Sequence, residues 1–311
     1  MIEDDDNWLI ETSIDYDLLC TFPTESLMKS QAVGNSKDHI VFHHTTLNAL
    51  SPIIEGRMFR FTRYDRMRND ETEGDYIYKL FSDVCDEIES ELGPELYNAL
   101  KDISSEEPFI ECYKEANRSV EAIPYVACFT RMDFSDTLRG RYCSDVTLKL
   151  DVSRGFPDRY QKDQEGEYLN VHVARVMYDT EQIKSNIRSA LRKAHELQPD
   201  TEKVVLYMRQ MLTLRRLLIK KEFFKDEYET RVIIFIPKDL EAHPEIEEMI
   251  PKQATIRCND RLIKTVVDFN PGDDYLFLPF NHTGNLELIR SDRTTDTMIA
   301  GSFVEKTDFV S

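Results

Sequence analysis

The chain has 311 residues, of which 41% are hydrophobic and 31% charged, with a formal net charge of −19 at pH 7 and a pI near 4.8. That length can bury a substantial core, and the composition is typical of a globular protein rather than a disordered or membrane-spanning one. The negative charge repels phosphate backbones at long range. It therefore excludes bulk non-specific binding to nucleic acid, although a local basic cleft stays possible.

The start of the chain, MIEDDDNWLI, is acidic where a secretory signal would be basic. No apolar run approaches the roughly 20 residues needed to cross a bilayer. The six cysteines are scattered, without a CxxC pair or zinc-finger spacing, which indicates reduced thiols. We therefore expect a cytoplasmic protein without a membrane partner.

The first half of the chain begins with a polar, irregular extension at residues 1–37. HIVFHHT at 39–45 is rich in β-branched and aromatic residues and predicts a strand. Leucine and isoleucine at helical spacing predict a short helix over 46–56, and RMFRF at 57–61 predicts a second strand. Four-residue spacing of apolar side chains then predicts helix within 71–103.

The second half alternates between strands and helices. We expect strands at 123–130, 146–152, 168–178, 229–237, 261–270 and 275–280, and helices at 180–197 and 201–224. Segregated strands and helices predict an α+β fold, with one domain over 38–311 and helical insertions at about 71–120 and 180–224. Five basic side chains near the end of the second helix are expected to form a solvated surface: Arg209, Arg215, Arg216, Lys220 and Lys221.

Two histidines end the first predicted strand, an unusual ending for a core strand. Successive side chains of a strand point to opposite faces, so His43 and His44 could not readily share a metal ion, and we expect no metal site there. His43 is either a ligand-binding residue at the floor of a cleft or a structural histidine with its hydrogen bonds satisfied. Thr45 and the next threonine would turn the chain and cap the following helix.

A second cluster of polar residues lies at the start of the strand at 229–237. Alternation predicts that Glu227, Glu229 and Arg231 project on one face. The apolar run VIIFI that follows is typical of a central strand, which would put these charges at the lip of a cleft. The alternative is an edge-strand face with salt-bridged charges, which contributes little energy.

The order of these motifs resembles a widespread bacterial family of unknown function. That family opens with His-Tyr-Thr and closes with aromatic-x-x-Glu-x-Glu-x-Arg, as FHHTT at 42–46 and FFKDEYETR at 223–231 do here. Matches in the same order cover roughly residues 39–290. His44 stands in place of the family's tyrosine, and Arg139–Tyr142 stand where a tryptophan and a glycine are usual.

The family's opening is in turn similar to the first strand of the ADP-ribosyltransferase superfamily. The resemblance implies a split β-sandwich with flanking helices and a cleft that takes NAD as substrate. Cleavage of the nicotinamide–ribose bond develops positive charge on the sugar, which a carboxylate stabilises. The residues implied are Glu229 as the catalytic carboxylate with Glu227 assisting, and His43, Thr45, Arg60, Arg63 and Tyr64 as the dinucleotide-binding set.

Some of these roles have open alternatives. Arg60 and Arg63 would bind the diphosphate, or are solvated surface arginines. Tyr64 would stack on nicotinamide, or anchors its loop. Arg231 would orient Glu229 or serve the scaffold.

The resemblance thus implies an intracellular ADP-ribosyltransferase or NAD glycohydrolase, of a kind often found in toxins and phage defence, with a protein or nucleic acid as acceptor. One alternative is a non-catalytic nucleotide- or partner-binding module of the same fold. Another is a metal-dependent nuclease that uses Glu227, Glu229 and Asp70.

Overall fold

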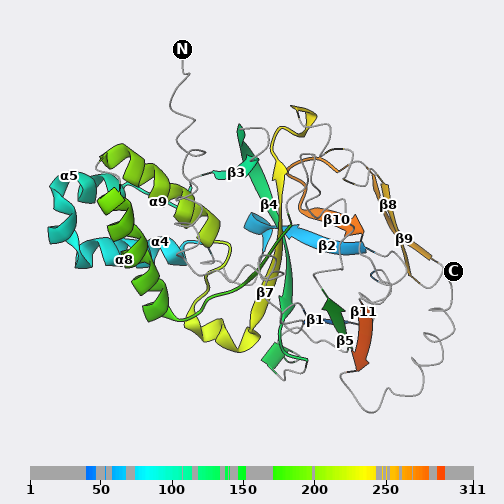
Figure 1. The fold of residues 1–311 in the computed structure, drawn as a ribbon. Coiled ribbons are helices and arrows are strands. Elements are labelled where there is room, and N and C mark those ends of the chain that lie inside the picture. The colour runs from blue at the N-terminus through cyan, green and yellow to red at the C-terminus, as the bar shows by residue number, and fades with distance from the viewer. Residues whose placement is uncertain are drawn as a thin grey trace.

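The computed structural model describes residues 40–46, 53, 58–67, 74–106, 108–113, 118–133, 137–138, 140, 146–151, 171–197, 200–242, 247, 250, 253–258, 261–267, 269–279 and 286–290. These residues form a curled antiparallel sheet with a group of helices to one side of its long central strands (Figure 1). The expected mixture of strands and helices is confirmed. Within this part of the chain, no helix is long and apolar enough to cross a membrane.

The described strands form one large sheet and one separate hairpin. The large sheet contains β1 (Ile40–Thr45), β2 (Met58–Arg63), β3 (Phe109–Tyr113), β4 (Arg118–Thr130), β5 (Val146–Asp151), β6 (Val171–Arg175), β7 (Glu229–Pro237), β10 (Tyr275–Pro279) and β11 (Leu286–Arg290). The hairpin consists of β8 (Gln253–Cys258) and β9 (Arg261–Val267). The sequence did not lead us to expect β3, β8 or β11.

Strand β4 organises the sheet because both of its edges are paired. One edge pairs with β7 along nine positions, from Ala122↔Pro237 to Thr130↔Glu229. The other edge pairs in turn with β3, β2 and β1. Along this edge, the pairing of β4 with β3 ends at Ala122 and its pairing with β2 begins at Tyr125. Strands β2 and β3 therefore diverge beside Ile123 and Pro124.

The two faces of β4 and β7 carry different clusters of apolar side chains. One cluster contains Tyr125, Ala127, Phe129, Val232, Ile234 and Ile236. The other contains Val126, Ile233 and Phe235, packed with Leu217 and Leu218 from the end of the helical part. Because successive side chains alternate, these strands are buried on both faces, as the run VIIFI predicts.

Four helices pack on one another around a cluster of their own: α4 (Tyr76–Glu87), α5 (Glu89–Lys101), α8 (Thr180–Leu197) and α9 (Thr201–Arg215). Ion pairs join α8 to the first two, such as Lys184–Asp83 at 3.4 Å and Arg192–Glu91 at 2.7 Å. Two segments distant in the sequence therefore form one helical layer (Figure 1).

The helix expected over 201–224 is wrong in its second half. Helix α9 ends at Arg215, and a 3-10 helix, η4, covers Glu222–Glu227. Between them Ile219 bridges Met177, so a tertiary contact replaces the helix. The prediction that the five basic side chains form a solvated surface is also wrong, because three of them are buried: Arg215, Arg216 and Lys220.

Candidate functional site

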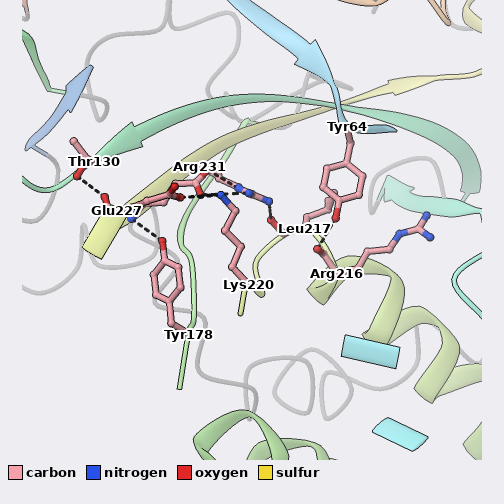
Figure 2. A network of polar contacts seen from close by, with 9 residues as sticks. Tyr64, Thr130, Tyr178, Arg216, Leu217, Lys220, Glu227 and Arg231 are labelled. Carbon is pink, nitrogen blue, oxygen red and sulfur yellow. Dashed lines mark hydrogen bonds and ion pairs between the residues drawn. The ribbon is translucent and has the colours of Figure 1, made fainter. Parts of the chain in front are cut away.

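Two carboxylates and two cations meet in the interior at the start of β7 (Figure 2). Lys220 Nζ lies 3.0 Å from Glu227 Oε2 and 2.7 Å from Glu229 Oε2. Arg231 donates from Nε to Glu229 Oε1 at 2.8 Å. All four side chains are buried, and their formal charges cancel. We call Lys220, Glu227, Glu229 and Arg231 the charge cluster.

The local backbone directs both glutamates inward. Tyr228, between them, has φ 45° and ψ 43°, the left-handed region that costs a non-glycine residue about 1–2 kcal/mol. This turn lets Glu227 at the end of η4 and Glu229 at the start of β7 reach the same lysine, while Tyr228 itself is exposed. Thr130 fixes the turn by donating to the Glu227 carbonyl at 2.7 Å.

The carboxylate of Glu229 is ionised and fully engaged. Burial alone would raise its pKa, but Arg231 and Lys220, together with hydrogen bonds from Arg231 and the Cys128 thiol, hold it at about 2. Burial and the Glu229 charge raise the pKa of Tyr178, whose hydroxyl accepts from the Glu229 backbone N–H at 3.0 Å. Both oxygens of Glu229 thus have cationic partners inside the protein.

His43 lies in an aromatic environment instead. Its ring centroid is 5.6 Å from that of Phe129 and 5.8 Å from that of Phe59, and Nδ1 lies 3.3 Å from the Cys128 carbonyl. Burial lowers the pKa of His43 to about 4 against the opposing effect of that hydrogen bond, so the ring is neutral at pH 7. His44 contacts Thr147 and the Met132 carbonyl.

The expected cleft between His43 and Glu229 is contradicted by the alternation of the strands. The His43 ring packs against Phe129, on the face of β4 that carries the first apolar cluster. Glu229 receives a hydrogen bond from Cys128, on the opposite face. The expected position of Glu227 and Glu229 at the lip of a cleft is therefore also wrong, since both lie in the packed interior.

An open cavity of about 1090 Å³ lies elsewhere, at the point where β2 and β3 diverge. Its walls come from the end of β2 and η2 (Tyr64–Arg66), the residues before α4, the residues between α5 and β3, the start of β3, residues 121–124 of β4, and Arg216 after α9. Its lining includes aromatic, basic and acidic side chains: Arg63, Tyr64, Arg66, Asp75, Glu106, Phe109 and Arg216. Neither His43 nor Glu229 is among its lining residues.

Aromatic rings and guanidinium groups form one wall of this cavity. The Arg216 guanidinium lies 3.8 Å from the Phe109 ring centroid, and Phe109 meets the Tyr64 ring edge to face at 6.0 Å. Tyr64 donates its hydroxyl to the Arg216 carbonyl at 2.7 Å. Arg63 is held by Asp65 at 2.6 Å and donates to the Gly272 carbonyl.

The structure thus separates the seven side chains expected at one site. Arg63 and Tyr64 line the cavity, and Glu227 and Glu229 belong to the charge cluster. Arg60 is exposed and stacks on Tyr275 at 4.8 Å, and Thr45 is buried in β1.

Sequence reasoning missed Lys220, Phe109 and Arg216. One signal could have indicated the counter-charge. The run VIIFI predicts a buried strand, and charged side chains at the start of a buried strand need oppositely charged partners that are also buried. Within the described residues no group of three or more histidines, cysteines or carboxylates is arranged to hold a metal ion. Asp70, which a nuclease site would use, lies outside those residues.

The fold and the two sites define a mixed α and β protein with a buried charge cluster and a separate open cavity. Comparison with models of protein families, with curated proteins and with solved structures found no match to this chain.

Proposed function

We propose that this chain is a nucleotide-binding module whose ligand occupies the cavity between β2 and β3, and that NAD is a ligand of this site. The observation that carries the proposal is the meeting of Tyr64, Phe109 and Arg216 at the wall of an open cavity of about 1090 Å³. Small-molecule sites typically measure about 300–1,000 Å³, so a nucleotide or dinucleotide has room.

The chemistry of the lining fits the three parts of a nucleotide. The half-buried ring of Tyr64 offers apolar surface to a base, and the buried Phe109, stacked with Arg216, supports it from behind. Arg66, whose side chain is more than half exposed, can move from Asp274 to a phosphate. Asp75 and Glu106 are exposed carboxylates that can accept hydrogen bonds from ribose hydroxyls.

Transfer of ADP-ribose is the competing function, and an ADP-ribosyltransferase-like split β-sandwich is the competing fold. The divergence of β2 and β3 along one edge of β4 supports such a split. The site chemistry argues for binding without cleavage. Glu229 would have to leave both Lys220 and Arg231 to reach a substrate, and removing a charge from a buried pair costs about 3–5 kcal/mol.

Calorimetric titration with NAD, combined with an assay for released nicotinamide, tests the proposal. We expect saturable binding without release. Arg66→Ala should weaken binding about tenfold, which corresponds to the loss of one charge-assisted hydrogen bond. Arg192→Ala is the matched control, because that arginine is also about half exposed and ion-paired but lies in the helical layer.

Two results would contradict the proposal. Absence of NAD binding to the wild-type protein would remove the proposed ligand. Release of nicotinamide that is lost in Glu229→Gln would instead support a transferase or glycohydrolase that rearranges its charge cluster.

A further inference from the structure

The segment Arg216–Lys220 follows α9. It begins at Arg216, which lines the cavity, and ends at Lys220 of the charge cluster (Figure 2). The carbonyl of Arg216 accepts from the Tyr64 hydroxyl at 2.7 Å. The next carbonyl, that of Leu217, accepts from Arg231 Nη1 at 2.5 Å. At the other end of the segment, Lys220 places its ammonium between the two glutamates. Five consecutive residues therefore join a cavity wall to a buried ionic centre. We call them the connecting segment.

The connecting segment is also held along its length. Met177 donates to the Leu218 carbonyl at 2.8 Å and accepts from the Lys220 N–H at 3.1 Å. The three side chains between Arg216 and Lys220 are buried: Leu217, Leu218 and Ile219. A close-packed segment of this kind has little room to absorb a displacement locally. A shift of the Arg216 carbonyl would therefore displace the neighbouring Leu217 carbonyl, which holds Arg231.

We infer that the connecting segment couples the cavity energetically to the charge cluster, with Tyr64 as the positioning residue at the cavity end. The part of this inference that concerns a bound nucleotide rests on the proposed function. A nucleotide that orders Tyr64 and Arg216 fixes the Arg216 carbonyl, and the cluster tightens. Energetic coupling is reciprocal, so loosening the charge cluster also lowers the affinity of the cavity for its ligand.

Hydrogen exchange in the absence of ligand tests the coupling first. Tyr64→Phe removes one hydroxyl and keeps the ring. We expect the amides of Leu218, Lys220 and Glu229 to exchange about fivefold faster, the factor that corresponds to one neutral hydrogen bond. The control is Tyr97→Phe, because Tyr97 donates to Asp86 at 2.8 Å within the helical layer, away from the segment. It should leave those three amides unchanged.

The pattern of exchange separates coupling from general destabilisation. Global destabilisation would accelerate the amides of Val232–Ile236 in the buried strand β7 as well, whereas coupling through the segment leaves them at the wild-type rate. Acceleration confined to residues 64–67 in Tyr64→Phe, or equal acceleration throughout β7, would overturn the inference.

Glu227→Gln tests the reverse direction. This substitution loosens Lys220 without touching the cavity. We expect faster exchange of the Met67 amide, which donates to the Tyr64 carbonyl, and about threefold weaker binding of NAD. Wild-type values for both would overturn the inference. If NAD fails to bind the wild-type protein, the proposed function is contradicted, while the comparison of Tyr64→Phe with Tyr97→Phe still decides the coupling.

Discussion

His43 and Glu229 lie on opposite faces of the same sheet, separated by β4. The imidazole packs against Phe129, and the carboxylate accepts a hydrogen bond from Cys128, the preceding residue of that strand. Two adjacent residues of a strand point in opposite directions. A single small ligand therefore does not contact both groups unless the sheet itself is rearranged.

The first prediction concerns the stability that Glu229 contributes. Glu229→Gln should lower the free energy of unfolding by about 3 kcal/mol, because Lys220 and Arg231 stay buried with one carboxylate fewer. Urea denaturation at pH 7 measures the effect. Glu222→Gln is the matched control: it breaks the exposed pair with Lys225 and should cost less than about 0.5 kcal/mol. Equal stability of the two variants would show that the charge cluster does not support the fold.

The second prediction follows from the lowered pKa of His43. Its pKa of about 4 in the folded state lies below the ordinary 6.5, so the unfolded chain binds more protons between these values. The corresponding stability is present above pH 6.5 and is lost as the pH falls toward 4. Between pH 7 and pH 5 the loss should be about 1.5 kcal/mol, after allowance for the partial exposure of the ring.

Replacement of the histidine checks this assignment. His43→Phe should show a smaller decline in unfolding free energy between pH 7 and pH 5 than the wild type, while keeping the ring contacts with Phe59 and Phe129. His195→Gln, at an exposed position of α8, controls for the loss of a histidine. An unchanged pH slope in His43→Phe would contradict the burial argument.

The third prediction concerns acid stability below the His43 range. The pKa of Glu229, about 2, lies below its ordinary 4.5, so its contribution is fully present above pH 4.5 and is lost as the pH falls toward 2. The wild-type protein should therefore lose stability relative to Glu229→Gln across this lower window. Parallel denaturation curves at pH 4.5 and pH 3 for the two proteins would disprove the assignment.

The fourth prediction uses Gly74, which borders the cavity. Its φ of +98° is unfavourable for other residues, and a Cβ atom there would lie 2.9 Å from the Tyr64 hydroxyl oxygen. Gly74→Ala should cost about 2 kcal/mol of unfolding free energy and weaken NAD binding, because Tyr64 must move. Urea denaturation and calorimetry measure the two effects.

A substitution at Gly93 is the control that separates the cost of backbone strain from the steric effect on Tyr64. It also has a positive φ, +74°, but an added Cβ atom would meet nothing within 4 Å. Gly93→Ala should therefore cost about 1 kcal/mol and leave NAD affinity unchanged. If both variants bound NAD as the wild type does, Tyr64 would not be part of the ligand site.

Local periodicity accounts for the elements that the sequence predicts well. The strand at 229–237 and the helix at 180–197 have the expected bounds, because each carries a complete apolar pattern with clear ends. The end of α9 could not be placed in this way. Leu217–Ile219 are apolar residues that a helix could also carry, and the pairing of Ile219 with Met177, a tertiary contact, shows that the chain has left the helix.

The site was predictable in part for the same reason. Alternation placed Glu229 and Arg231 on one face, as the salt bridge between them shows. Their burial depends on Lys220, which sits in a run of charges that looks solvent-exposed in the sequence. The separation of His43 from Glu229 depends on the register of β1 and β7 against β4, which no local pattern contains.

The location of a bound nucleotide tests the central claim most directly. A crystal structure of the protein soaked with NAD should show the ligand in the cavity, against Tyr64, Phe109 and Arg66, with Glu229 still bound to Lys220 and Arg231. Density for NAD beside Glu229 and His43, with the charge cluster opened, would contradict the account.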